Sequence, residues 1–156
     1  MAELNERPII FPYSNPTSRS ECSAEEAYRW SDGRAIFASG SPFPPVEIRG
    51  RKFVPNQGNN VYIFPAMAMA LFATEATLVT DEMFLTAAQA IAEQVSDDNL
   101  AAELIYPPRE RIFASSLHVA ERVASCIFDQ GLARLPRTAD DCALIRSSVY
   151  RPVYAE

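Results

Sequence analysis

The feature that most constrains this fold is a pair of short, largely apolar segments flanking one well-signalled helix near the N-terminus. Pro8–Phe11 and Arg34–Ser39 are continuous runs, which is typical of parallel strands covered on both faces. Between them, Ser23 and Glu26 have the spacing of a capping box, and Gly33 marks the expected helix end. Strand, helix and strand with short links form a βαβ unit, so the two strands should be parallel.

The turns that follow these strands, at 14–17 and 39–42, are the first candidate site. Both should lie at the carboxyl edge of the sheet, where open α/β sheets bind ligands. Two strands are too few for an independent sheet, because sheets usually hold about four to six and unpaired edges need partners. The pattern indicates a chain that completes a larger structure.

Helices are predicted to dominate the remainder. A small hairpin over Val46–Val54 and an uncharged, amide-rich loop over Pro55–Asn60 precede them. Apolar stripes at helical spacing comprise Phe84, Ala88, Ile91 and Val95, and then Ile112, Val119, Val123 and Ile127. The expected helices cover about 61–74, 82–95, 96–104, 108–130 and a short stretch within 139–147.

The first of these helices should be buried on most sides, because no charged residue lies between Lys52 and Glu75. Asn59 or Asn60 is its expected N-cap. Pro65 indicates either a kink or a start close to that proline.

The predicted fold is therefore α/β: a partial Rossmann-like, doubly wound unit (a parallel βαβ plus a small hairpin) followed by a C-terminal helical region. We expect the first domain to cover 1–76 and the C-terminal helices and tail to cover 77–156.

Composition narrows the function. A formal net charge of −6 argues against nucleic acid as a partner. The chain has one lysine, Lys52, and one histidine, His118, so carboxylates are almost the only candidates for a general base. Three cysteines, Cys22, Cys126 and Cys142, form no CxxC pair, which favours thiols in a reducing compartment over a zinc or redox site.

Neither a targeting segment nor a membrane span is predicted. The charged N-terminus resembles no signal or transit peptide. The longest apolar run, Val61–Ala73, is shorter than the roughly 20 residues that a span needs. We expect a soluble intracellular protein, with cytoplasm, mitochondrion and plastid all open.

Amide side chains are the candidate ligand contacts. Asn59 and Asn60, at the expected helix N-terminus, suit a carboxylate or a nicotinamide amide, although loop composition alone favours a plain N-cap, because Asn is a preferred cap residue. Asn15, in the first strand-end turn, is either an Asx-turn residue or a second contact in the same crevice.

Several motifs in order resemble the malic enzymes over nearly the whole chain, and the likeness weakens after Gly131. These motifs are RPIIF, SNPT, EC and AEEAY within 7–28, GR, FASGSPF within 33–43, QGNNVYIFP at 57–65 and YPP at 106–108.

This resemblance implies the C-terminal portion of an enzyme that oxidatively decarboxylates L-malate to pyruvate and CO2 with NAD or NADP and Mg2+ or Mn2+. It implies substrate contacts at Asn15 and at Asn59 or Asn60. The same resemblance implies that the dinucleotide side is lined by Ser14, Asn15, Ser39, Gly40, Gly58 and Asn60.

The family's catalytic lysine and tyrosine, its acidic metal ligands and its glycine-rich dinucleotide fingerprint have no counterpart here. Lys52 does not match the family's lysine. Three interpretations follow: a piece of an active malic enzyme, a non-catalytic docking or structural subunit derived from one, or half of a split enzyme completed by a partner chain. The chain alone is predicted to be inactive, and the sequence does not decide between NAD and NADP.

Overall fold

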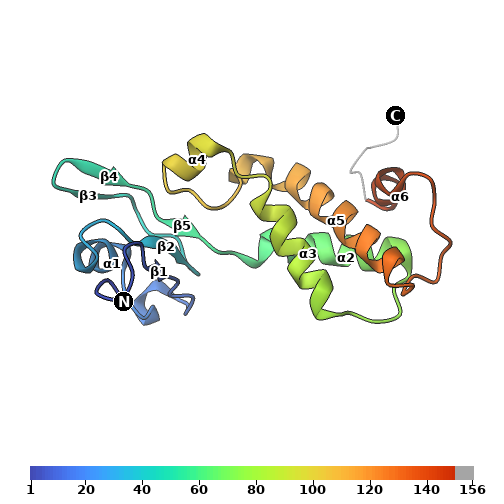
Figure 1. Cartoon of the computed structure of the whole chain (residues 1–156), viewed down its shortest axis with the longest axis horizontal. Helices are drawn as coiled ribbons and strands as arrows, with labels where there is room; N and C mark the ends of the chain where they lie inside the picture. The colour runs from blue at the N-terminus through green and yellow to red at the C-terminus, as the bar shows by residue number, and fades with distance from the viewer. Residues whose placement is uncertain (150–156) are drawn as a thin grey trace, which may run out of the picture. The chain divides into compact units, whose positions relative to one another are not determined.

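The computed structural model describes residues 1–149, which form two compact units (Figure 1). The sheet unit comprises Met1–Asn59 and Val95–Tyr106, and the helical unit comprises Asn60–Gln94 and the chain from Pro107 onward. The prediction of domains over 1–76 and 77–156 concerns the organisation of a complete enzyme and stays a prediction.

The sheet unit is built on three parallel strands. They are β1 (Ile9–Ile10), β2 (Ile36–Ser39) and β5 (Asn56–Gln57), in the order β1-β2-β5. Ile9 pairs with Ile36, and Ala38 pairs with Asn56, both in parallel. The predicted parallel βαβ unit is confirmed, whereas the predicted amide-rich loop is wrong in part, because it contains the third strand.

One helix and one hairpin complete the α/β part of this unit. α1 (Ala24–Trp30) has the predicted capping box: the Ser23 hydroxyl accepts from the Glu26 N–H at 3.2 Å, and the Glu26 carboxylate accepts from the Ser23 N–H at 2.8 Å. The predicted hairpin is confirmed as β3 (Val46–Ile48) antiparallel to β4 (Arg51–Phe53).

Aromatic rings hold α1, the sheet and the hairpin together. The buried ring of Tyr28 stacks on Phe53, with centroids 4.6 Å apart, and lies 5.7 Å from the ring of Phe37. Burial raises the pKa of Tyr28 to about 12. The sheet is thus covered on its α1 face by a core formed within this unit.

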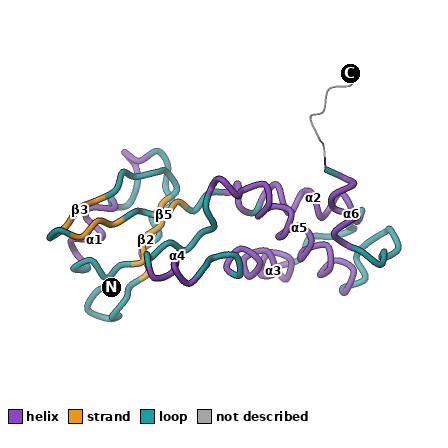
Figure 2. The backbone as a smooth tube through the Cα atoms, turned by 90° about the horizontal axis from the view of Figure 1, so that it is seen from above, coloured by secondary structure: helices purple, strands orange, loops and turns teal. Residues whose placement is uncertain are grey.

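The helical unit packs around one long helix, α5 (Ile112–Asp129), which contacts α2 (Phe64–Thr74), α3 (Asp81–Ala92) and α6 (Asp141–Ser148) (Figure 2). Val119, Val123 and Ile127 of its predicted stripe are fully buried. The short α4 (Asp97–Ala101) belongs to the sheet unit, and 3-10 turns lie at Thr17–Arg19, Asn60–Tyr62 and Arg109–Arg111.

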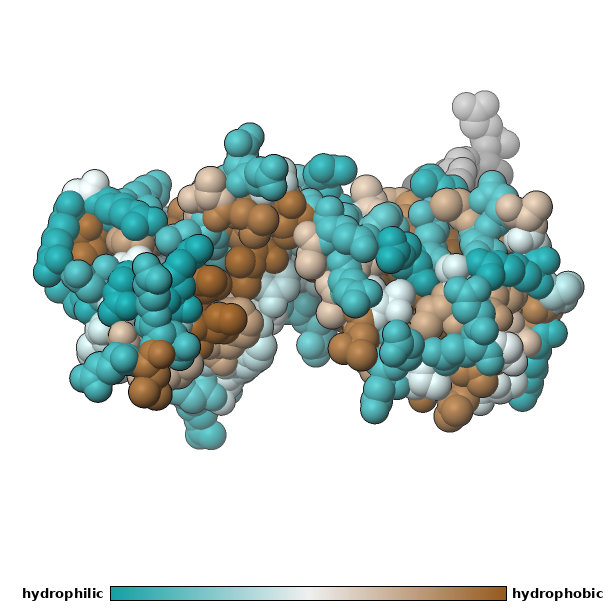
Figure 3. All heavy atoms as spheres, in the orientation of Figure 1, coloured by the Kyte–Doolittle hydropathy of each residue, from teal (hydrophilic) through white to brown (hydrophobic). Residues whose placement is uncertain are grey.

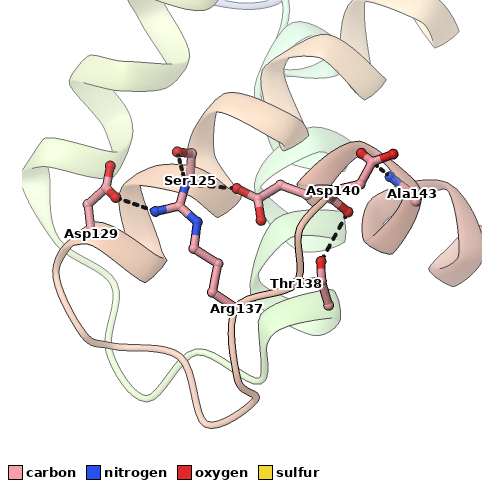
Figure 4. Close-up of polar contacts among 7 residues, drawn as sticks. Ser125, Asp129, Arg137, Thr138, Asp140 and Ala143 are labelled. Carbon is pink, nitrogen blue, oxygen red and sulfur yellow. Dashed lines mark hydrogen bonds and ion pairs between the residues drawn. The ribbon is translucent and has the colours of Figure 1, made fainter.

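Arg137 ties the segment between α5 and α6 to both helices (Figure 4). Its guanidinium donates to Asp129 at 2.5 Å, to the Ser125 hydroxyl at 2.7 Å and to Asp141 at 2.9 Å. The two carboxylates raise the pKa of Arg137. Since a planar guanidinium can donate in several directions at once, this arrangement depends on arginine rather than on positive charge alone.

Two predictions about buried helix faces are wrong in part. In α3, Ile91 of the predicted stripe is buried, but Phe84 and Ala88 are exposed and Met83, Ala87 and Ala90 are buried instead, so the buried stripe lies one residue earlier than expected over most of its length. Both spacings satisfy a helical period, and packing against α5 selects the second. In α2, Phe64 and Phe72 are exposed, so the helix is buried on one side only.

Candidate functional site

Asn15 joins the two strand-end turns. Its Oδ1 accepts a hydrogen bond from the Ser41 hydroxyl, in the turn after β2, and its Nδ2 donates weakly to the Tyr13 carbonyl at 3.4 Å. The side chain is exposed. The predicted convergence of these turns is therefore observed, and the second N–H of the Asn15 amide lies at an accessible edge of the sheet.

Ser14 is fixed by Glu21 rather than left open. The Ser14 hydroxyl donates to Glu21 at 2.6 Å, and the Ser14 N–H donates to the same carboxylate at 3.3 Å. The hydroxyl hydrogen bond is the largest cause that lowers the pKa of Glu21. This pair braces the turn that presents Asn15.

This bracing predicts a pH-dependent loss of stability. The pKa of Glu21 is lower in the folded protein than the ordinary value of 4.5, so its contribution is complete above that value and is lost as pH falls through the folded-state pKa. We expect Glu21→Gln to lower Tm at neutral pH, with a gap to wild type that closes below pH 4.5, in thermal melts from pH 7 to 3. Ser14→Ala should show the same pH window; a gap that is constant over the whole range would contradict the assignment.

Position 40 requires glycine, because the turn that contains Asn15 approaches its backbone too closely for a side chain. A Cβ atom at this position would meet the Tyr13 carbonyl oxygen and both amide atoms of Asn15. The Gln57 amide also donates to the Gly40 carbonyl at 3.1 Å. The glycine thus permits the close approach that positions Asn15.

Tyr13 covers Gly58. A Cβ atom on Gly58 would stand 2.5 Å from the Tyr13 hydroxyl oxygen, and that hydroxyl lies 3.1 Å from the hydroxyl of Tyr106. Burial, followed by this hydrogen bond, raises the pKa of Tyr13. The phenol is therefore held protonated and serves to position the Gly58 loop.

The remaining predicted contacts fall into two classes. Ser39 is buried, and its hydroxyl donates to the Ser41 carbonyl at 2.8 Å, so its side chain shapes the turn from within. Asn59 and Asn60 are exposed; Asn59 ends the first segment of the sheet unit, and Asn60 begins the helical unit. Neither is the N-cap of α2, which is Ile63, so that prediction is wrong.

The structure therefore brings together Ser14, Asn15, Ser39, Gly40 and Gly58, all within the sheet unit. Sequence reasoning missed Tyr13 and Glu21, which hold them, and placed Ser41 in the second turn without giving it a role. The position of Tyr13, two residues after the predicted strand and just before the turn at 14–17, was the one available signal for it. The seven-residue spacing of Ser14 and Glu21 matches no regular period.

The cysteine thiols and the possible metal ligands within residues 1–149 form no second reactive site. Burial raises the pKa of Cys22, and a hydrogen bond with Glu121 raises that of Cys142 to about 11, so both thiols are protonated at neutral pH. Within residues 1–149, no three His, Cys, Asp or Glu side chains are placed to hold a metal ion. Over the same residues, no helix is long and apolar enough to cross a bilayer.

A parallel sheet with a covering helix, and with turns gathered at the carboxyl ends of its strands, is the arrangement of a Rossmann-like α/β unit. The family model described as "Malic enzyme, NAD binding domain" matches residues 1–128. The chain belongs to the malic enzyme family.

Individual relatives agree with this assignment. NADP-dependent malic enzymes from Vitis vinifera and Phaseolus vulgaris are 52% and 53% identical to it, each over 99% of this chain and 26% of their own length. The crystal structure of malic enzyme from Pyrococcus horikoshii Ot3 superposes with a TM-score of 0.70 at 27% identity, covering 92% of this chain and 29% of that one. The chain thus spans about a quarter of the length of the relatives it matches.

Proposed function

We propose that this chain supplies the wall of a malic-enzyme active site that orients substrate and cofactor during oxidative decarboxylation of L-malate to pyruvate and CO2. The observation that carries the proposal is the exposed Asn15 amide, which is held between two strand-end turns by its hydrogen bonds with Ser41 and Tyr13. Its neutral donor and acceptor suit a carboxylate or carboxamide group, and its preset position lowers the entropic cost of binding.

The residues divide the work by chemistry. Asn15 and Asn59 or Asn60 would donate amide hydrogen bonds to malate. Ser14, Ser39, Gly40 and Gly58 would form the dinucleotide side, where their turns permit close backbone approach. NAD or NADP would fit beside Asn15 and would accept the hydride; the relatives named as NADP-dependent favour NADP.

The divalent metal does not fit the described residues, since they contain no cluster of ligands for it. We therefore assign Mg2+ or Mn2+, together with the general base and acid, to polypeptide other than residues 1–149: either more of the same malic enzyme or a partner chain. The alternative, a docking subunit without turnover, would retain the fold without needing Asn15. An intracellular site of action is consistent with a relative from Zea mays that is named chloroplastic.

The test is kinetic and uses a complete enzyme in which this chain replaces the aligned region of the Vitis vinifera relative. Asn15→Ala and Asn60→Ala should each remove a hydrogen bond to a charged substrate, worth about 1.5–3 kcal/mol, or roughly 10- to 150-fold in kcat/KM for malate. Asn5→Ala, at an exposed position outside both turns, is the matched control. If both site variants were kinetically silent, the substrate assignment would be wrong.

A further inference from the structure

One face of α2 is apolar yet uncovered. Phe64, Ala68 and Phe72, which we call the α2 stripe, follow one another at intervals of four residues and therefore lie on one helix face. The two phenylalanines are 74% and 76% exposed, and Ala68 is exposed as well. Hydrophobic residues are visible between polar ones at the surface of both units (Figure 3). The α2 stripe differs from such scattered residues because its helix carries no charged side chain.

The contrast with α3 shows why. Phe84 and Leu85 are also exposed, but Asp81 and Glu82 share their helix. α2 has no charged residue, and none lies anywhere between Lys52 and Glu75. A helix that is apolar all round is normally buried all round, whereas α5 and α6 cover α2 on one side only, over Ala66, Met67, Ala70 and Ala73.

Two observations indicate which polypeptide would cover the exposed face of α2. The relatives align with nearly all of this chain through only 26% of their own length, so a malic enzyme contains about three times as much further polypeptide. The stripe also begins four residues after Asn60, at the loop where that polypeptide would have to bring its base and metal ligands.

We propose that the α2 stripe is the docking surface for the remaining part of a malic enzyme, which contacts it through an apolar surface. This inference rests on the proposed function. Residues four apart form the ridge used in the commonest class of helix packing, and the small Ala68 lies between the two phenylalanines along this ridge. Exposed aromatic side chains of this kind are enriched at protein–protein interfaces.

The test uses the whole chain, tagged and co-expressed with the Vitis vinifera enzyme from which the aligned region is removed. The truncated enzyme should co-purify with the wild-type chain. Phe64→Asp and Phe72→Asp should each reduce its recovery about tenfold or more, because a charge would be buried at a hot spot. Phe84→Asp, the same change on an exposed face of α3, should retain recovery within about twofold.

Three further results test whether the α2 stripe is the docking surface. Circular dichroism should show that the variants keep wild-type helix content, as expected for positions already in water. Failure of the wild-type chain to capture the truncated enzyme, or equal loss with Phe84→Asp, would overturn the proposal. A concentration-dependent dimer of the chain alone that Phe72→Asp abolishes would assign the stripe to a second copy instead.

Activity separates this inference from the proposed function. Capture without malate turnover would leave the docking surface standing and reject the catalytic role. Malate turnover that Phe72→Asp leaves unchanged would support the catalytic role and reject the docking surface.

Discussion

Asn56→Asp is expected to unfold the sheet unit under conditions in which the wild-type protein is folded. The buried Asn56 amide donates to the Phe37 carbonyl at 3.0 Å and to the Glu103 carbonyl at 2.8 Å, and its oxygen accepts from the Ile105 N–H at 2.9 Å. A carboxylate keeps the size and the acceptor but sets a negative oxygen against two carbonyl oxygens. Burying an unpaired charge costs several kcal/mol, about as much as a small domain's whole stability.

Asn56→Ala isolates the lost hydrogen bonds from the added charge. It should lower the free energy of unfolding by about 2–4 kcal/mol, because three backbone groups lose their partner. Urea titration followed by fluorescence of Trp30, the single tryptophan, reports on α1 within the same unit. Asn5→Ala, at an exposed asparagine, should change the midpoint little; an Asn56→Asp protein as stable as wild type would contradict the role of the amide.

Asn56 also shows where sequence reasoning stopped. The βαβ unit was predictable because apolar runs, a capping box and a terminal glycine agree with one another. β5 was not, since Asn and Gln are poor strand formers and an amide-rich segment is typical of a loop. The strand exists because the Asn56 side chain supplies hydrogen bonds to β2 and to the segment at 103–105.

The α2 prediction failed for a different physical reason. The absence of charge in α2 predicts that the helix is buried, but it does not show whether this chain or another polypeptide covers each face. Pro65 correctly indicated a start near Phe64, which excludes Asn59 and Asn60 as caps. Periodicity in α3 left two stripes possible, and only contact with α5 distinguished them.

The candidate site was predictable to the level of the turns. Parallel strands place their following residues at one edge, so Asn15 and Gly40 could be expected to meet. The supporting contacts could not be predicted, because Tyr13, Glu21 and Tyr106 act through packing and loop geometry that no short motif encodes.

The pure chain is expected to show no malate-dependent reduction of NADP or NAD with Mn2+. Oxidation of malate needs a base at its hydroxyl, and decarboxylation needs a cation or acid to stabilise the enolate. Lys52 is exposed on the hairpin, and His118 lies 3.7 Å from Glu93 on the helical unit, with no metal cluster within residues 1–149. Without the base and the cation, correctly placed amides stabilise the substrate as well as the transition state and so leave the chemical barrier in place.

The measurement is absorbance at the reduced nicotinamide band, with the full-length chimera described above as the positive control. The chimera should turn over malate, and the pure chain should stay at the background rate even at high protein concentration. Enzyme-like turnover by the pure chain would mean that Asp, Glu or His residues here supply the base and bind the metal. That outcome would transfer the whole mechanism to this chain, and it would remove the reason for assigning the amides of Asn15 and of Asn59 or Asn60 to orientation alone.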